Sequence, residues 1–275
     1  MGRIGNSIQL LKASWEVLKA DKELIALPII SGVVSVIVAL SFFVPLFLAQ
    51  GLSVAEDPGP LEYILLFTMY AALAYVTIFF NTALVHAAHE RLGGGDPTIK
   101  SALRGARARA GKILPWALVS ATVSVLLRAL EERVGVLGRI VVSLVGLAWS
   151  LVTFLVLPLI VIEGVGVGEA IRRSKDLFKR TWGENVAAQV GFGLLGFVAI
   201  LPGVLIAVVG VGLGGAIAGI AILVAVIWIV GVIAAIAAMS VIFQTALYHF
   251  AVDGEVPSGF FSDGQMRAAF ESPIR

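Results

Sequence analysis

The residue types that most readily do chemistry in this sequence lie in two related segments. FNTALVHAAHE covers residues 80–90 and FQTALYHFAVD covers residues 243–253, so that six of the first nine residues match and Gln244 replaces Asn81. The first segment carries His86 and His89, nearly one helical turn apart, and the second carries His249. Because imidazole binds metals and transfers protons near neutral pH, the three histidines could together form a metal or proton site.

The spacing of these histidines does not favour that interpretation. His86 and His89 are followed by Glu90, which is not the His-Glu-x-x-His order that joins two zinc ligands to a general base. A histidine at the end of a span can instead bond to water, a headgroup or a helix-end carbonyl, and its protonated form suits a helix C-terminus. We therefore expect no catalytic residue, no metal and no cofactor. We interpret the repeated segment as the mark of a duplicated architectural unit.

Other polar groups fall inside or beside long apolar runs. Asn81 and Gln244 could bond a lipid headgroup or a neighbouring helix, and bonding between helices is the favoured interpretation. Ionisable groups within spans mark ion-coupled transporters, but Glu163 and the histidines all fall near span ends. The candidates for ligand or interface contact are His86, His89, His249, Glu163, Asn81 and Gln244.

The composition predicts a membrane protein. Of the 275 residues, 59% are hydrophobic and only 14% are charged, whereas charged residues make up about 25% of soluble domains. A net charge of +2, spread over short connecting segments, does not indicate nucleic-acid binding. The absence of cysteine excludes a disulfide framework or a thiol nucleophile.

Apolar stretches predict an all-α bundle of six spans, since a span needs about 20 apolar residues. Sixty-eight consecutive uncharged residues precede Asp253, enough for two long spans or three short ones. The glycine cluster at residues 210–215 offers one turn and favours two. The predicted spans cover residues 24–49, 61–88, 113–130, 140–162, 186–209 and 216–250.

The distribution of positive charge predicts the orientation. With both termini inside, seventeen lysines and arginines lie on the cytoplasmic side, and only Arg128, Arg133 and Arg139 lie outside. Positive residues near span ends accumulate on the cytoplasmic side. We therefore expect a multi-pass protein of a prokaryotic cell membrane with cytoplasmic N- and C-termini.

Amphipathic helices are predicted before each hairpin and at the C-terminus, over residues 6–20, 98–112, 168–183 and 263–270. Leu18 and Trp15 belong to an apolar stripe of the first, and Ile171, Ser174, Phe178 and Trp182 form that of the third. Asp96 before Pro97 predicts the N-cap of the second. These helices could lie on anionic lipid headgroups or pack on the bundle, and both alternatives stay open.

The organisation is thus three units, each an amphipathic helix followed by a helical hairpin. Gly191, Gly193 and Gly196 on the fifth span, with Gly215 and Gly219 on the sixth, predict close helix packing. Packing within the last hairpin is the favoured interpretation, and a face for a homo-oligomer or a membrane-protein partner is the alternative.

Two further stretches resemble known membrane proteins. SIQLLKASWEVLKADKELIALPIISGVVS, residues 7–35, resembles the opening of an uncharacterised family of prokaryotic integral membrane proteins, with its Ser and Trp helix followed by Asp-Lys-Glu-Leu. GEAIRRSKDLFKRTWGENV, residues 168–186, is similar to a helix of that family. More loosely, it is similar to membrane domains attached to some glycerophosphodiester phosphodiesterases. The resemblance implies the architecture and no activity.

We therefore expect an integral membrane protein that is a non-enzymatic structural or partner-binding component. The alternative is a transporter or lipid-handling protein for an apolar or lipid-like substrate. Its pathway would run near Pro158 and Pro202, since broken helices can form transport sites.

Overall fold

A computed structural model describes residues 3–50 and 59–253, with the backbone alone described over residues 3–11, 49–50, 60, 62, 178–192 and 253. Every regular element in this part of the chain is helical. In order, they are α1 (Arg3–Ala20), α2 (Glu23–Gln50), α3 (Pro60–Leu92), α4 (Ile99–Arg133), α5 (Val136–Val152), α6 (Val156–Pro158), the π-helical turn η1 (Leu159–Glu163), α7 (Val167–Leu213) and α8 (Gly215–Asp253).

Six segments of the described chain are long and apolar enough to cross a membrane, which confirms the predicted all-α, six-span architecture. The last apolar region forms two spans, as predicted, with the turn at Gly214 and Gly215. Both glycines have positive φ, +69° and +58°, a conformation that a residue with a Cβ rarely adopts. The fourth span differs from the prediction because it is broken into α5, α6 and η1.

Two predicted surface helices are not separate from the spans that follow them. Residues 98–112 and 113–130 belong to the single helix α4, and residues 168–183 continue into the fifth span as α7. The predicted cap of α4 at Asp96 was wrong. Thr98 is the N-cap, because its hydroxyl accepts from the Ser101 N–H while the Ser101 hydroxyl accepts from the Thr98 N–H. The predicted helix at residues 263–270 lies outside the described residues.

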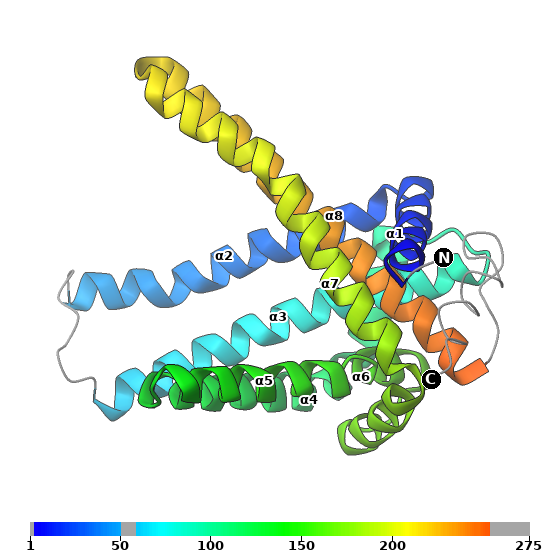
Figure 1. Cartoon of the computed structure of the whole chain (residues 1–275). Coiled ribbons are helices and arrows are strands. Elements are labelled where there is room, and N and C mark those ends of the chain that lie inside the picture. The colour runs from blue at the N-terminus through cyan, green and yellow to red at the C-terminus, as the bar shows by residue number, and fades with distance from the viewer. Residues whose placement is uncertain (1–2, 51–58, 254–275) are drawn as a thin grey trace.

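The core lies at one end of the bundle, which we call the base. Here α1 and the first turns of α2, α4 and α7 meet the last turns of α3 and α8 and the broken fourth span. The largest fully buried side chains include Leu18, Leu84, Ile113, Ile160 and Phe243, each from a different one of these elements. Figure 1 shows α1 and the end of α8 on the same side, where this core lies.

Away from the base the spans diverge. In Figure 1 the α7–α8 hairpin, in yellow and orange, leaves the base in a different direction from α2, α3, α4 and α5. The outer halves of the spans therefore expose large apolar side chains, such as Leu48, Leu66, Leu205 and Ile227. Since backbone polar groups of a helix are satisfied internally, such surfaces are stable against lipid acyl chains.

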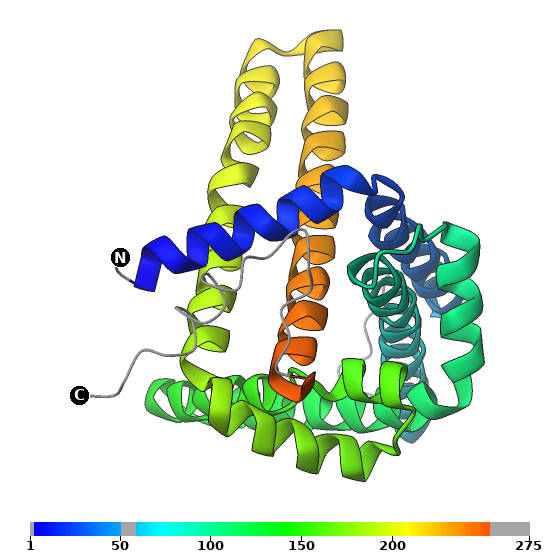
Figure 2. The ribbon, with the colours of Figure 1, turned by 90° about the vertical axis from the view of Figure 1, so that its right-hand side faces the viewer.

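Helix α1 packs across the base. Figure 2 shows it crossing α7 and α8, and it contacts both. Val17 and Leu18 are buried in the core, whereas Trp15 of the predicted apolar stripe is 41% exposed. The Lys19 ammonium lies 5.8 Å from the centre of the Trp15 ring. Bundle packing thus accounts for one face of α1, and Trp15 faces outward at the edge.

The α7–α8 hairpin packs through three glycines of α7 spaced seven residues apart, Gly196, Gly203 and Gly210. A Cβ at Gly203 would lie 2.8 Å from Trp228 of α8, and one at Gly210 would overlap the Cβ of Ala221. Seven-residue spacing keeps contacts on one face of two helices that coil around each other. Of the predicted glycines, Gly196 takes part, whereas Gly193, Gly215 and Gly219 face open space.

We predict that Gly210→Ala destabilises the hairpin by about 1–3 kcal/mol, because the added methyl group overpacks against Ala221. Thermal unfolding of the purified protein in detergent measures the change. Gly212→Ala is the matched control, since the added Cβ there meets no side chain or other helix within 4 Å. The double variant Gly210→Ala/Ala221→Gly should recover much of the loss. Equal behaviour of the two single variants would contradict the packing.

Candidate functional site

The repeated segments form matching parts of the base. Thr82 and Thr245 occupy equivalent places, both are fully buried, and each hydroxyl donates to the carbonyl four residues earlier at 2.8 Å. The alanine and leucine that follow each threonine are buried as well. A buried hydroxyl that bonds within its own helix leaves no polar group unsatisfied in the core. The shared residues of the repeat are therefore packing residues at the ends of α3 and α8.

The structure brings together His89 and His249. His89 Nδ1 lies 2.9 Å from His249 Nε2, and the two rings stack with their centroids 4.9 Å apart. One ring must donate and the other accept, so at least one imidazole in this pair is neutral. The contact joins α3 to α8 and is half-buried.

His86, the residue equivalent to His249 in the repeat, lies elsewhere. Its ring packs against Gly105 of α4 so closely that a Cβ there would overlap it. Asn81 is half-buried on α3. Within the described residues, no group of three or more His, Asp or Glu side chains is placed to hold a metal ion. The three histidines thus do not converge on a common centre.

Glu163 lies at the end of the broken fourth span and holds it to α7 and α8. Both carboxylate oxygens accept from the Arg173 guanidinium, one of them at 2.9 Å. The Tyr248 hydroxyl also donates to Glu163 Oε1 at 2.9 Å. A two-point pair of arginine with carboxylate has fixed geometry and is stronger than a neutral hydrogen bond.

The break in the fourth span is closed by side chains from other helices. The Ser174 hydroxyl of α7 donates to the Val152 carbonyl at 2.6 Å and accepts from the Leu155 N–H at 3.1 Å. The Gln244 amide of α8 donates to the Phe154 carbonyl. Backbone groups freed inside a bilayer must find such partners, because no water is available there. Gln244 is therefore a helix-to-helix contact, as the sequence predicts.

Two basic residues of α4 bond to the end of the same span. Arg109 Nε donates to the Val161 carbonyl at 3.0 Å, and the Lys112 ammonium donates to the Gly164 carbonyl. Cations near a helix C-terminus bond its last carbonyls and stabilise its dipole. Sequence reasoning counted both residues only as topological charges. Their i, i+3 spacing was the available signal that they share one face of α4.

An ion pair connects the α1–α2 link to the end of α3. Asp21 is 7% exposed, and its Oδ2 lies 3.2 Å from Arg91 Nε. Burial raises the pKa of the Asp21 carboxyl above its ordinary value. Arg91 lowers that pKa, and the carboxylates of Asp96, Glu23 and Glu90 raise it further.

Two of those carboxylates position the start of α4. Glu23 Oε2 accepts from the Ile99 N–H at 3.1 Å, and Glu90 Oε2 accepts from the Ser101 hydroxyl at 3.1 Å. Unpaired N–H groups in the first turn of a helix attract negative charge. The α1–α2 link and the α3 terminus are thereby fixed to α4.

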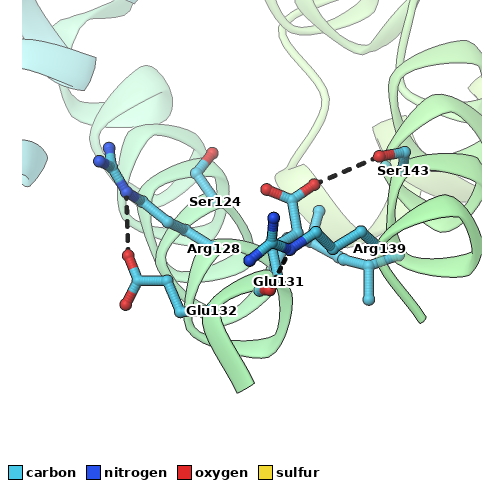
Figure 3. Close-up of a pocket in the computed structure, with 9 residues that line it drawn as sticks. Ser124, Arg128, Glu131, Glu132, Arg139 and Ser143 are labelled. Atoms are coloured by element: carbon cyan, nitrogen blue, oxygen red, sulfur yellow. Dashed lines mark hydrogen bonds and ion pairs between the residues drawn. The ribbon is translucent and has the colours of Figure 1, made fainter. Parts of the chain in front are cut away.

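A second polar cluster lies at the opposite end of the molecule, between α4 and α5. Figure 3 shows Glu131, Arg139 and Ser143 coming together between the two helices, while Arg128 and Glu132 pair on the other flank of α4. These residues line a cavity of about 700 Å³. From the sequence, only the arginines of this cluster were singled out, as positive charges on the outer side of the membrane.

The six apolar helices define a multi-pass α-helical membrane protein. Its spans are held together at the base by a packed core and by hydrogen bonds between helices. Residues 60–260 match the family described as "Family of unknown function (DUF6159)". This match covers more than half of the chain, and the protein belongs to that family. It confirms the expectation of an uncharacterised family.

No curated protein matches the chain. The family match begins at residue 60, so the resembling run at residues 7–35 lies outside it and residues 168–186 lie inside. Neither comparison supports the looser likeness to membrane domains of glycerophosphodiester phosphodiesterases.

We predict that Asp21 makes the stability of the base pH-dependent. Because its pKa is raised in the folded state, protonation favours folding. The stability of the wild type relative to Asp21→Asn should be greatest below the ordinary Asp pKa of about 3.9 and should fall as pH rises through the raised pKa. Unfolding temperatures of both proteins, measured from acid to neutral pH, test this. A difference that stays constant or grows with pH would refute it.

Proposed function

We propose that this protein is a non-enzymatic structural or partner-binding component of the cell membrane, with the base and both termini on the cytoplasmic side. Glu163 carries the proposal. It lies at the end of the fourth span and accepts hydrogen bonds from Arg173 and Tyr248 on two other helices. Both oxygens of this carboxylate are thus engaged in contacts between helices, so its observed role is to hold the fourth span to α7 and α8.

The other polar groups of the base support the same reasoning. His89 bonds His249, and Ser174 and Gln244 bond the backbone of the fourth span. Each of these contacts joins different helices. They serve to fix the arrangement of the spans, which is what a structural component requires. A partner protein or a second copy would have access to the apolar outer halves of the spans.

We predict that Glu163→Gln lowers the free energy of unfolding by about 1–3 kcal/mol, because it weakens a charge-assisted contact that is largely shielded from solvent. Glu169→Gln is the matched control, since Glu169 is exposed near the start of α7 and its loss should cost less than about 0.5 kcal/mol. Both variants and the wild type are then assayed against ester, phosphodiester and peptide substrates.

Wild-type protein is expected to hydrolyse none of these substrates. Hydrolysis by the wild type that disappears in Glu163→Gln, while the variant remains folded, would contradict the non-enzymatic proposal.

The exposed basic residues of the base support its placement on an anionic lipid surface. Lys100, Arg104 and Arg107 are exposed on the first turns of α4, at spacings of four and three residues. Trp15 is exposed on α1 beside Lys19. Indole rings favour the membrane interface, and basic side chains are attracted to anionic headgroups.

We predict that the triple variant Lys100→Gln/Arg104→Gln/Arg107→Gln loses most of the thermal stabilisation that phosphatidylglycerol gives relative to phosphatidylcholine. Each cation near an anionic surface contributes about 1 kcal/mol. Arg133→Gln, an exposed charge at the other end of α4, is the control. Stabilisation that is unchanged in the triple variant, or equally reduced in the control, would argue against the basic face as the lipid contact.

The alternative of a lipid-handling protein draws support from the cavity between α4 and α5. It draws none from the region of Pro202, where Gly203 and Trp228 are in close contact and Trp228 Nε1 donates to the Ala199 carbonyl at 2.8 Å.

A further inference from the structure

The cavity between α4 and α5 is built from two facing helix surfaces. Ser124, Leu127, Arg128 and Glu131 of α4 are spaced three, one and three residues apart, and Arg139, Val142, Ser143 and Gly146 of α5 have the same spacing. Side chains at this spacing share one helical face. Glu132 completes the lining of this cavity of about 700 Å³, which is open to its surroundings because most of the lining residues are exposed.

The lining carries both signs of charge. Two arginines and two glutamates surround the cavity. Arg139 Nε donates to the Glu131 carbonyl at 3.3 Å, and the Ser143 hydroxyl donates to Glu131 Oε1 at 3.3 Å. Arginine has five N–H donors, and this bond takes one of those of Arg139. A ligand that fits must therefore offer an anion to a guanidinium and a cation to a carboxylate over a short distance.

The position of the cavity points to a lipid as the source of that ligand. It lies beside the α4–α5 turn, where the charged residues of these two spans end the apolar sequence. Deeper in the span the lining is Ser124, Leu127, Val142 and Gly146, of which the serine is polar. Leu126 and Leu144, beside these residues in the sequence, are exposed apolar side chains. A headgroup at the charged end would thus have its acyl chains along α4 and α5.

We infer that this cavity binds a zwitterionic phospholipid with a primary ammonium, the phosphatidylethanolamine class. Its phosphate binds the Arg139 guanidinium, with Arg128 at the rim, and its ammonium binds the Glu131 carboxylate and the Ser143 hydroxyl. Guanidinium groups suit phosphate. A primary ammonium donates three hydrogen bonds, whereas quaternary ammonium groups are recognised by aromatic cages. The Tyr70 hydroxyl of α3 accepts from Arg128 at 2.9 Å. Among the described residues, none of those that line the cavity is aromatic.

Binding is tested with purified full-length protein in detergent, titrated with phosphatidylethanolamine, phosphatidylcholine or phosphatidylglycerol of identical acyl chains. Native mass spectrometry and thermal shift give the apparent affinity. Phosphatidylethanolamine is expected to bind about tenfold more tightly than either of the others, the effect of one charge-assisted hydrogen bond. Equal affinity for the three lipids would overturn the inference.

Variants locate the site. Arg139→Gln and Glu131→Gln should each lower the affinity for phosphatidylethanolamine about tenfold and reduce the preference over the other two lipids. Arg133→Gln removes an exposed charge from the same turn, outside the lining, and should leave affinity unchanged. Ser143→Ala is a milder change that keeps the charges. It should reduce the preference for phosphatidylethanolamine over the other two lipids with little effect on overall affinity. Unchanged binding in all three lining variants would refute the site.

Competition by a soluble headgroup tells whether the cavity binds a lipid or a soluble molecule with the same charged groups. Glycerophosphoethanolamine carries the same phosphate and ammonium without acyl chains, and it should compete only weakly. Competition at concentrations comparable to the lipid would overturn the lipid assignment in favour of a soluble zwitterion. The cavity lies at the end of α4 opposite the basic face, so either result is independent of the contact of the base with anionic lipid.

Discussion

The need to satisfy the backbone of the broken fourth span is the constraint on which the rest of this structure depends. Between α5 and η1 the helical hydrogen bonds are interrupted, and the carbonyls of Val152 and Phe154 take side-chain donors instead. In a bilayer an unsatisfied carbonyl costs several kcal/mol. The donors come from α7 and α8, so closing the break also fixes where these two helices must lie.

The same constraint explains why the polar groups gather in the base. Arg109 and Lys112 close the far end of the fourth span from α4, while Glu163 ties that end to Arg173. The packed core is formed by the turns of the spans that lie at the base. The outer halves are free to diverge, and their apolar side chains meet lipid at little cost because both are equally apolar.

The division between base and outer halves also separates the two proposed lipid contacts. At the base, exposed cations face outward from a rigid core and suit a surface of uniform negative charge. At the α4–α5 turn, arginine and glutamate side chains line the same cavity, and we propose that they suit a ligand carrying both charges. One protein thus presents two electrostatically different surfaces at the two ends of the same helix, α4.

The histidines mark how far sequence reasoning could go. The repeat correctly indicated an architectural role, because Thr82 and Thr245 with their apolar neighbours are buried in the same way. Which histidine would meet His249 could not be predicted. His86 and His89 differ by about 60° around α3, and the rotation of α3 that turns His89 to α8 and His86 to Gly105 is set by packing.

The sequence by itself determined the six spans and the glycine turn before α8, because span length and turn conformation depend on local residues. It also indicated Gln244 as a contact between helices. Only the tertiary structure decided that the fourth span breaks, that Ser174 and Arg109 bond its backbone, and that Arg139 bonds the Glu131 carbonyl. These contacts join residues whose meeting depends on how whole helices cross and rotate, and local periodicity carries no information about that.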